Sequence, residues 1–432
     1  MQNVLDYGAK GDGKTLDTAA IQAAIDAGGE VYFPAGTYLT GTLYLKSNGG
    51  LNLAQGAVIK ASHNREDYNA DDFCPQNRVF ADEEVTGAHL ITAVGQENIY
   101  IRGKGMIDGD ANYWMNDSRL SYLNKASSYT PNENRIGQMI FICECSNVTV
   151  TDVTLYHASY WHLFFHGCTD VRVDGLLIRG QIRQYTNDGI DIDCCKRVTI
   201  SNCNIHVGDD AIAVRANDAP LTVRRPCEDV TVTNCVLSSN GDYGIRVGVG
   251  KGLIRNCVFS NLVIDESAYG IGLGCRFSPE ATGGVRIENL FFNNIIIRAR
   301  MALQIRTSRS DVDGEITEET YVKNVKFSNI HAESVLCNDF VCHPNTEISD
   351  IVFKDVDFVT GGEELFPTVF DMNRWFSQKG YAVEIRDIKS ITLDRVSIKY
   401  KPNTTDFENG LYIKNSGAIL ENCKIDNGIL EE

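Results

Sequence analysis

Aspartates concentrate in one stretch of the chain, and their type and spacing suit proton transfer. Asp188 and Asp209 are 21 residues apart, and Asp210 follows directly. Carboxylates packed closely together repel one another, so at least one of the three should have a raised pKa. Hydrolysis of a glycosidic bond needs one carboxyl group to donate a proton and another to activate water. We therefore expect Asp188, Asp209 and Asp210 to be catalytic.

Other polar and aromatic residues near this stretch carry weaker signals. Asp191 and Asp193 follow Asp188 on an expected strand, and alternation points at least one of them away from a common site, so turn formation or calcium binding is the interpretation we favour. His206 lies three residues before Asp209 and is a candidate for binding substrate, against the alternative of a packed or surface histidine. Trp161 is suited to stacking on a sugar ring, and burial in the core is the equal alternative.

A repeated phrase indicates the elements that must position these residues. Copies lie at 147–155, 170–178, 197–205 and 229–237, and each is two short β-branched strands joined at an Asn, Asp or Gly corner. The copies are 23, 27 and 32 residues apart, which is too long for a hairpin and fits one coil of a parallel β-helix. One coil then separates Asp188 from Asp209, so they should share a face about 5 Å apart.

The rest of the chain fits one solenoid domain over residues 1–432. Residues 1–40 form an N-terminal cap region, with a short amphipathic helix expected after Asp17 to cover the open first coil. Segments 61–95 and 110–140 lack the repeat and are expected to be inserted loops, with a late loop at 360–385. The Asn-Cys pairs at Asn202, Asn234 and Asn256 are expected to stack as structural ladders.

Composition limits the function classes. The formal net charge is −17, and the resulting repulsion argues against nucleic acid and anionic membrane as partners. Fourteen cysteines show no zinc-finger spacing, and we interpret them as mostly reduced, buried thiols. The N-terminus shows no signal peptide, which predicts a cytoplasmic protein, and no apolar run is long enough to span a membrane.

The sequence resembles glycoside hydrolase family 28, the polygalacturonase-like family of right-handed parallel β-helices. Its Asn-Thr-Asp-Gly-x-Asp signature is similar to residues 186–191, with the first two residues exchanged, and its Gly-Asp-Asp signature matches residues 208–210. Further matching segments are residues 7–13, 31–38, 103–109 and 160–162. The resemblance implies that Asp209 is the general acid and that Asp188 and Asp210 hold and deprotonate the attacking water. It implies inversion at the anomeric carbon, with no cofactor and no metal.

Two family motifs are altered in this chain. The family's Gly-His-Gly should fall within residues 240–248, where Tyr243 occupies the histidine position beside Asp242. The family's Arg-x-Lys, which grips a uronate carboxylate, should fall within residues 269–276, where Gly272 and Gly274 stand instead. Without those cations a uronate loses charge-assisted contacts. Substitutes from neighbouring coils are Arg246, Arg276 and Arg306, against the alternative of a solvated surface for each.

The function we predict is an inverting, exo-acting, polygalacturonase-like hydrolase of short pectic or related oligosaccharides. Tyr243, Asp242, Arg246, Arg276, His206 and Trp161 are the residues expected to bind substrate. One alternative is another β-helical sugar enzyme, such as a lyase, an epimerase or a glycosyl-transferring relative. The other is a non-catalytic carbohydrate-binding or structural β-helix. The sequence sets neither the sugar and linkage nor the oligomeric state.

Overall fold

The computed structural model describes most of the chain. The described residues are 1–79, 83–114, 134–182, 184, 186–278, 281–309, 314–362, 380–402, 404 and 407–432. They group into two compact units. The first unit comprises Met1–Asp209 and Ala219–Arg224, and the second comprises Asp210–Asp218 and Arg225–Glu432. The single domain expected from the sequence stays a prediction.

The first unit is built from short strands with few helices. Its helical elements are η1 (Val4–Tyr7), α1 (Thr18–Asp26), η2 (Arg65–Asp67) and α2 (Ala111–Trp114). Its strands are β1 (Gln2–Asn3), β2 (Asp12–Leu16), β3 (Glu30–Phe33), β4 (Gly36–Thr40), β5 (Leu43–Tyr44), β6 (Gly49–Leu53), β7 (Ala57–Ala61), β8 (Ile91–Val94), β9 (Glu97–Gly103), β10 (Met106–Asp108), β11 (Ile140–Cys143), β12 (Ser146–Thr151), β13 (Thr154–Tyr156), β14 (Leu163–His166), β15 (Thr169–Asp174), β16 (Leu177–Arg179), β17 (Ile190–Asp193), β18 (Lys196–Ser201) and β19 (Asn204–Val207).

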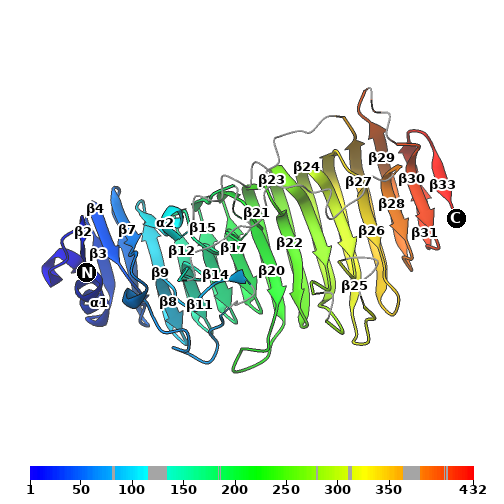
Figure 1. The fold of residues 1–432 in the computed structure, drawn as a ribbon. Coiled ribbons are helices and arrows are strands. Elements are labelled where there is room, and N and C mark those ends of the chain that lie inside the picture. Colours follow the sequence, from blue (N-terminus) through cyan, green and yellow to red (C-terminus); the bar gives the residue numbers. More distant parts are fainter. Residues whose placement is uncertain are drawn as a thin grey trace. The chain divides into compact units, whose positions relative to one another are not determined.

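These strands form three parallel ladders, one on each side of a repeating coil (Figure 1). One ladder runs β1-β3-β6-β9-β12-β15-β18, and a second runs β2-β4-β7-β10-β13-β16-β19. The third ladder, β5-β8-β11-β14-β17, carries its last strand directly after Asp188. Each coil therefore contributes one strand to each side, which is the parallel β-helix that the repeat predicts.

The second unit continues the same pattern with longer strands that run around the corners. They are β20 (Ile212–Ala216), β21 (Cys227–Ser239), β22 (Tyr243–Gly250), β23 (Leu253–Gly274), β24 (Arg286–Arg306), β25 (Tyr321–Ser334), β26 (Asn338–Val341), β27 (Glu347–Thr360), β28 (Tyr381–Arg386), β29 (Ile391–Tyr400), β30 (Asn409–Lys414), β31 (Ala418–Glu421), β32 (Lys424–Ile425) and β33 (Ile429–Glu431). The strand pairings described in this unit are parallel, for example β22 with β23 and β23 with β24.

The expected capping helix is confirmed as α1. Its residues Ile21, Ala24 and Ile25 are buried, and it contacts β1, β3 and β5 at the start of the first unit. The segment 61–95 is partly regular, because η2 and β8 lie within it. In segment 110–140, α2 is described and residues 115–133 lie outside the described residues, as do residues 363–379 of the late loop.

Asparagine ladders exist, but the predicted grouping of Asn234 with Asn256 is wrong. Asn256 lies opposite Asp229, and Asn234 lies opposite Asn261, because the strand register pairs Val230 with Cys257. The two asparagines therefore occupy different corners of the coil. True ladders include Asn261-Asn294-Asn329, where the amide-to-amide distances are 2.7 and 3.1 Å. The Asn-Cys pair occurs at two different corners of the coil. Matching the repeats by sequence alone therefore aligned Asn234 with Asn256 although they belong to different corners.

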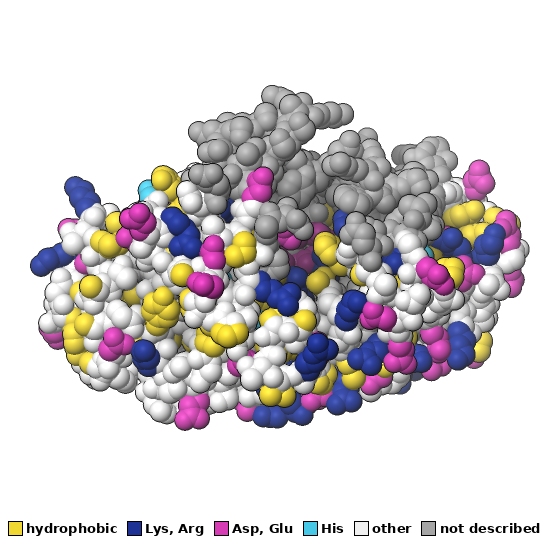
Figure 2. Space-filling model, turned by 60° about the horizontal axis from the view of Figure 1, so that its bottom comes forward, with side chains coloured by type: hydrophobic (Ala, Val, Ile, Leu, Met, Phe, Trp, Pro, Cys, Tyr) yellow, Lys and Arg dark blue, Asp and Glu magenta, His cyan; other side chains and the backbone are white. Residues whose placement is uncertain are grey.

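The cysteines follow the expected distribution. All fourteen cysteines lie in the described part of the chain, no disulfide joins any of them, and all but Cys74 and Cys423 are buried. Acidic and basic side chains are interspersed over the face that Figure 2 shows. No helix among the described residues is long and apolar enough to cross a membrane.

The core of the second unit contains a stack of phenylalanine rings. Phe259, Phe292, Phe327 and Phe353 lie at matching positions of successive coils, with ring centroids 4.6, 4.8 and 4.7 Å apart. Truncation of Phe292 should leave a cavity that the rigid coils above and below cannot fill. We expect Phe292→Ala to lower the free energy of unfolding by about 3–5 kcal/mol, measured by urea denaturation.

Phe291 provides the matched control, because its side chain points outward and is 38% exposed. We expect Phe291→Ala to change the free energy of unfolding by less than about 1 kcal/mol. Equal losses in the two variants would contradict the stacked core.

Candidate active site

The backbone around Asp188 is held by a buried histidine. The carbonyl oxygen of Asp188 accepts hydrogen bonds from the backbone N–H of His162 at 2.8 Å and from its ring Nδ1 at 2.9 Å. Burial lowers the pKa of His162 to about 4, so the ring is neutral at pH 7. Its Nε2 then accepts the backbone N–H of Ala158 at 3.3 Å. Nδ1 therefore holds the backbone of Asp188, and Nε2 holds the ring itself in place.

Asn187 joins the loop before Asp188 to the turn that carries Asp209. Its side-chain oxygen accepts the backbone N–H of Gly208 at 2.7 Å and that of Asp209 at 3.2 Å. Its side-chain nitrogen donates to the carbonyl of Gln181 at 2.9 Å. A Cβ at Gly208 would lie 2.2 Å from the carbonyl oxygen of Gln184, so only glycine allows this approach. The two aspartates are thus placed by one buried amide.

Asp188 and Asp209 lie close together, as one-coil spacing predicts. Each offers a carboxylate oxygen, and these oxygens lie within 4.8 Å of each other. Asp188 is 3% exposed, whereas Asp209 is half-buried. One water molecule spans such a distance with two hydrogen bonds of about 2.7 Å. The pair is therefore suited to sharing a proton and a water.

In the second unit, Asp210 is buried against a cation and a backbone donor. Its carboxylate lies 3.2 Å from the guanidinium of Arg246 and accepts the backbone N–H of Tyr243 at 3.2 Å. Arg246 also lies 4.0 Å from Asp242, and its guanidinium lies over the rings of Tyr243 and Phe277. Arg246 therefore lies beside a residue that is predicted to be catalytic. Its predicted role in binding substrate stays a prediction.

Tyr243 fills the space at Gly272. The tyrosine ring lies where a side chain at position 272 would be, because a Cβ there would be 2.1 Å from the ring. The ring stacks on Tyr269 at 4.6 Å, and its hydroxyl donates to Oε1 of Gln304 at 2.6 Å. Burial raises the pKa of Tyr243, so the hydroxyl stays protonated. In the next coil, Gln304 lies opposite Gly272 and Arg306 opposite Gly274.

The remaining predicted residues lie at separate places. Arg276 is buried, and its guanidinium donates to Ser308 Oγ and to the carbonyls of Ala281 and Gly314. Arg306 forms an ion pair with Asp339 at 3.2 Å. Trp161 is buried and stacks on Tyr160 at 4.9 Å. His206 lies on β19, opposite Arg179 in the strand register. Their roles toward substrate stay predictions.

Sequence reasoning did not single out His162, Asn187 or Gln304 as site residues. His162 and Asn187 stand inside matched family segments, but their task is to bond backbone groups, and no spacing rule reveals such a contact. Gln304 acts from the coil after Gly272, and only the strand register brings it to Tyr243. An adjacent-coil alignment of the repeat could have found it.

Aromatic residues of the segment 61–95 pack over the strands of the first unit. The ring of His89 stacks on Phe141 at 4.6 Å, and Phe73 contacts both rings edge-on. His89 Nδ1 lies 2.9 Å from the carbonyl of Gln138. This insertion therefore covers part of the third ladder, whose last strand, β17, follows Asp188.

Comparison with known proteins identifies the family. A sequence model of glycosyl hydrolases family 28 matches residues 65–373, and one described as rhamnogalacturonase A/epimerase, pectate lyase-like, matches residues 1–53. The chain belongs to glycosyl hydrolases family 28. The first match covers most of the chain, including both aspartate signatures.

Several relatives in family 28 are named polygalacturonases. An exo-poly-alpha-D-galacturonosidase of Dickeya chrysanthemi is 25% identical over 400 residues, which cover 82% of this chain and 65% of that protein. An endo-polygalacturonase of Pectobacterium parmentieri is 24% identical over 390 residues, covering 88% of this chain and 85% of that protein. This family 28 chain therefore spans less than two thirds of the length of the Dickeya protein.

A solved structure supports the fold. A hyperthermoactive exopolygalacturonase from Thermotoga maritima aligns with a TM-score of 0.69 and 21% identity, covering 94% of this chain and 92% of that one. The predicted fold class, a right-handed parallel β-helix with an N-terminal capping helix, is confirmed.

Removal of the Asn187 amide should loosen the turn that carries Asp209. In Asn187→Ala the amides of Gly208 and Asp209 lose their acceptor, and we expect a loss of about 1–3 kcal/mol in stability. Amide hydrogen exchange at these two residues should accelerate, as measured by NMR. In the control Asn202→Ala, which removes an exposed bond to Asp174, exchange at both should be unchanged. Unchanged exchange in Asn187→Ala would contradict the bridge.

Asp242 should titrate near neutral pH. Burial, with the charge of Asp210 nearby, raises the pKa of Asp242 to about 7, while Arg246 opposes the shift. Carboxyl-carbon NMR should show this midpoint, and Arg246→Met should move it higher. The pKa of Asp242 is higher in the folded than in the unfolded protein. The contribution of the protonated Asp242 to the free energy of unfolding is therefore complete below about pH 4 and is lost as the pH rises through about 7. Asp242→Asn should remove this pH dependence, and a midpoint near 4 would refute the shift.

Proposed function

We propose that this protein is an inverting, exo-acting hydrolase of short pectic or related oligosaccharides. The observation that carries the proposal is the Asp188–Asp209 pair, held within 4.8 Å by the Asn187 bridge in a family 28 chain. In this assignment Asp209 donates a proton to the leaving oxygen. Asp188 and Asp210 hold and deprotonate the water that attacks the anomeric carbon from the opposite side.

The three aspartates have different surroundings. Asp188 is held through its own backbone, and the carboxylate of Asp210 lies 3.2 Å from the guanidinium of Arg246. Asp209 is half-buried next to Asp188. A carboxyl group beside another carboxylate keeps its proton to a higher pH, which is what a general acid requires.

Exo action is supported by the covered strand face and by the relatives. Phe73 and His89 of the insertion pack over Phe141, on the ladder that ends beside Asp188. A covered face restricts how far a chain of sugars extends in that direction. The Dickeya relative is named an exo-poly-alpha-D-galacturonosidase. We therefore propose that one sugar, or a short end fragment, is released at each cut.

The charges of the second unit bear on which sugar is accepted. Arg246 and Arg306 are each paired with an aspartate, Asp210 and Asp339. A uronate carboxylate would have to compete with these partners for the guanidinium groups. We propose that acidic sugars are recognised less strongly than by family members with the Arg-x-Lys pair. We further propose that the protein works in a reducing compartment, which the absence of disulfides among its fourteen cysteines supports.

The test is an NMR time course on short oligosaccharides, both uronate-containing and neutral. We expect release of a single sugar in the inverted anomeric form. Asp209→Asn should lower the rate at least about 100-fold, because a general acid contributes about 10²–10⁴-fold.

The matched control is Asp152→Asn, which removes an exposed carboxylate that pairs with Lys104 and should leave the rate unchanged. Internal fragments in the first minutes would refute exo action, and retained anomeric configuration would refute the water-activating roles. An unsaturated product would indicate a lyase. Binding without any cleavage would indicate a non-catalytic β-helix.

A further inference from the structure

A second cluster of polar side chains lies in the first unit, apart from the residues assigned above. The strands β14 and β17 pair in register, which sets His166 directly opposite Asp193. Their neighbours Phe165 and Ile192 are fully buried in the core. Because side chains alternate along a strand, His166 and Asp193 project together from the other side of the sheet. Both are nonetheless at most 3% exposed.

Cys194 joins this pair through an unusual backbone conformation. Strict alternation would turn the residue after Asp193 to the opposite face. Cys194 instead has φ of 52°, in the left-handed region, at the corner where the strand ends. Gly167 takes the same conformation at the corresponding corner of the preceding coil, with φ of 67°. Glycine or asparagine adopts it at less cost than cysteine, so the backbone does not explain a cysteine here.

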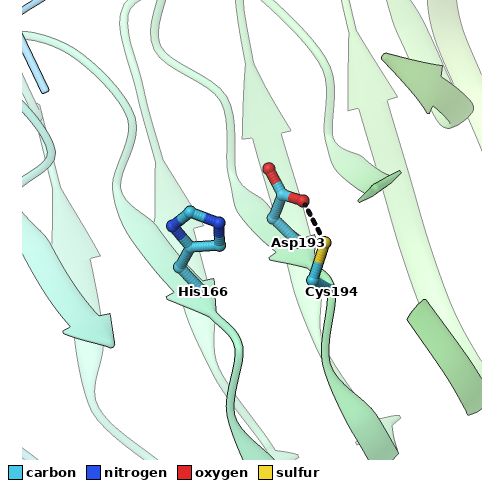
Figure 3. A group of neighbouring side chains, drawn as sticks. All are labelled: His166, Asp193 and Cys194. Atoms are coloured by element: carbon cyan, nitrogen blue, oxygen red, sulfur yellow. Dashed lines mark hydrogen bonds between the residues drawn. The ribbon is translucent and has the colours of Figure 1, made fainter. Parts of the chain in front are cut away.

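Figure 3 shows the imidazole of His166 beside the Asp193 carboxylate and the Cys194 thiol. One potential ligand atom from each residue lies within 4.8 Å of the other two. The Cys194 sulfur is 3.3 Å from Oδ1 of Asp193. Around a zinc ion the bonds to sulfur, nitrogen and oxygen are about 2.0–2.3 Å, so tetrahedral ligands lie roughly 3.3–3.7 Å apart. Small side-chain movements would bring the three atoms to that spacing.

The surroundings close this cluster from solvent. Residues 219–224 pack on the same row of corners: Thr222 bonds Glu144 through its backbone N–H and its hydroxyl, at 2.9 and 2.8 Å. The side chain of Leu221 covers Gly167, since a Cβ there would be 2.8 Å from Cδ2 of the leucine. The ring of Phe164 packs against His166 at 5.3 Å. A charged ligand group in such a dry place is stabilised by a bound cation.

We propose that His166, Asp193 and Cys194 bind one divalent transition-metal ion of the zinc type. One imidazole nitrogen, one carboxylate oxygen and one thiolate sulfur are the ligand types that zinc prefers, and magnesium or calcium would not select the sulfur. Binding replaces the S–H bond of Cys194 by a metal–sulfur bond and releases that proton to solvent. Three protein ligands leave the fourth position to water or to another oxygen ligand.

Cobalt substitution tests the proposal, because Co²⁺ reports its ligands optically. The full chain is first dialysed against a chelator and then titrated with Co²⁺ or Zn²⁺. We expect one equivalent to bind and a sulfur-to-cobalt charge-transfer band to appear in the near ultraviolet. In Cys194→Ser this band should be lost and Zn²⁺ should bind at least about 100-fold more weakly, since even hydrogen-bond partners of ligands are worth about 10–100-fold. Asp193→Asn should weaken Zn²⁺ binding similarly.

Cys195→Ser is the matched control, because its thiol is equally buried but bonds the carbonyls of Phe165 and Asp193 instead. It should keep both the band and the affinity. Circular dichroism of the metal-free variants checks that each is folded. The proposal is overturned by wild-type protein that shows no charge-transfer band at saturating Co²⁺, or by Cys194→Ser that keeps it. A cation held by Asp188 and Asp209 would give oxygen ligands and no such band.

Discussion

Parallel hydrogen bonding between successive coils is the constraint on which the rest of the structure depends. Strands in one ladder lie about 4.8 Å apart and in register, so residues at equivalent positions become direct neighbours. A sequence separation of one coil thereby becomes a contact, as it does for Phe292 and Phe327 in the core or Asn294 and Asn329 at a corner. The same rule places His166 beside Asp193. In this fold, a cluster of functional side chains is therefore formed by residues at equivalent positions of successive coils rather than by one loop.

The sequence predicts the coil well because its period is regular and its strands are short and β-branched. The capping helix was equally visible, since Ile21 and Ile25 recur at helical spacing. Prediction failed where two positions in the coil use the same residue type. Asn234 and Asn256 both precede cysteine, yet the register puts them at different corners. Local similarity does not distinguish one corner from another, whereas the hydrogen-bonded ladder does.

The proximity of Asp188 and Asp209 could be predicted, but the contacts that hold them in place could not. Carboxylates at family spacing are a strong signal, because few structural roles need three of them so near one another. His162 and Asn187 act on backbone groups, through the carbonyl of Asp188 and the amides of Gly208 and Asp209. Such contacts depend on how the chain bends between strands, and residue type alone does not encode that bend. Glycines at positions 180 and 208, where a Cβ would collide with neighbouring atoms, mark the same bend.

The two altered family motifs are one structural change rather than two. The tyrosine at the family's histidine position lays its ring over Gly272, the family's arginine position, where a Cβ would be 2.1 Å from the ring. An arginine at 272 and the present position of Tyr243 therefore exclude each other. With the arginine absent, the hydroxyl of Tyr243 reaches Gln304 in the next coil at 2.6 Å. The place of the family's arginine is thus taken by a neutral, hydrogen-bonded ring, and Arg246, whose guanidinium lies 5.5 Å from the centre of that ring, also faces Asp210. The two alterations are therefore coupled sterically, and both are consistent with the weaker recognition of acidic sugars that we propose.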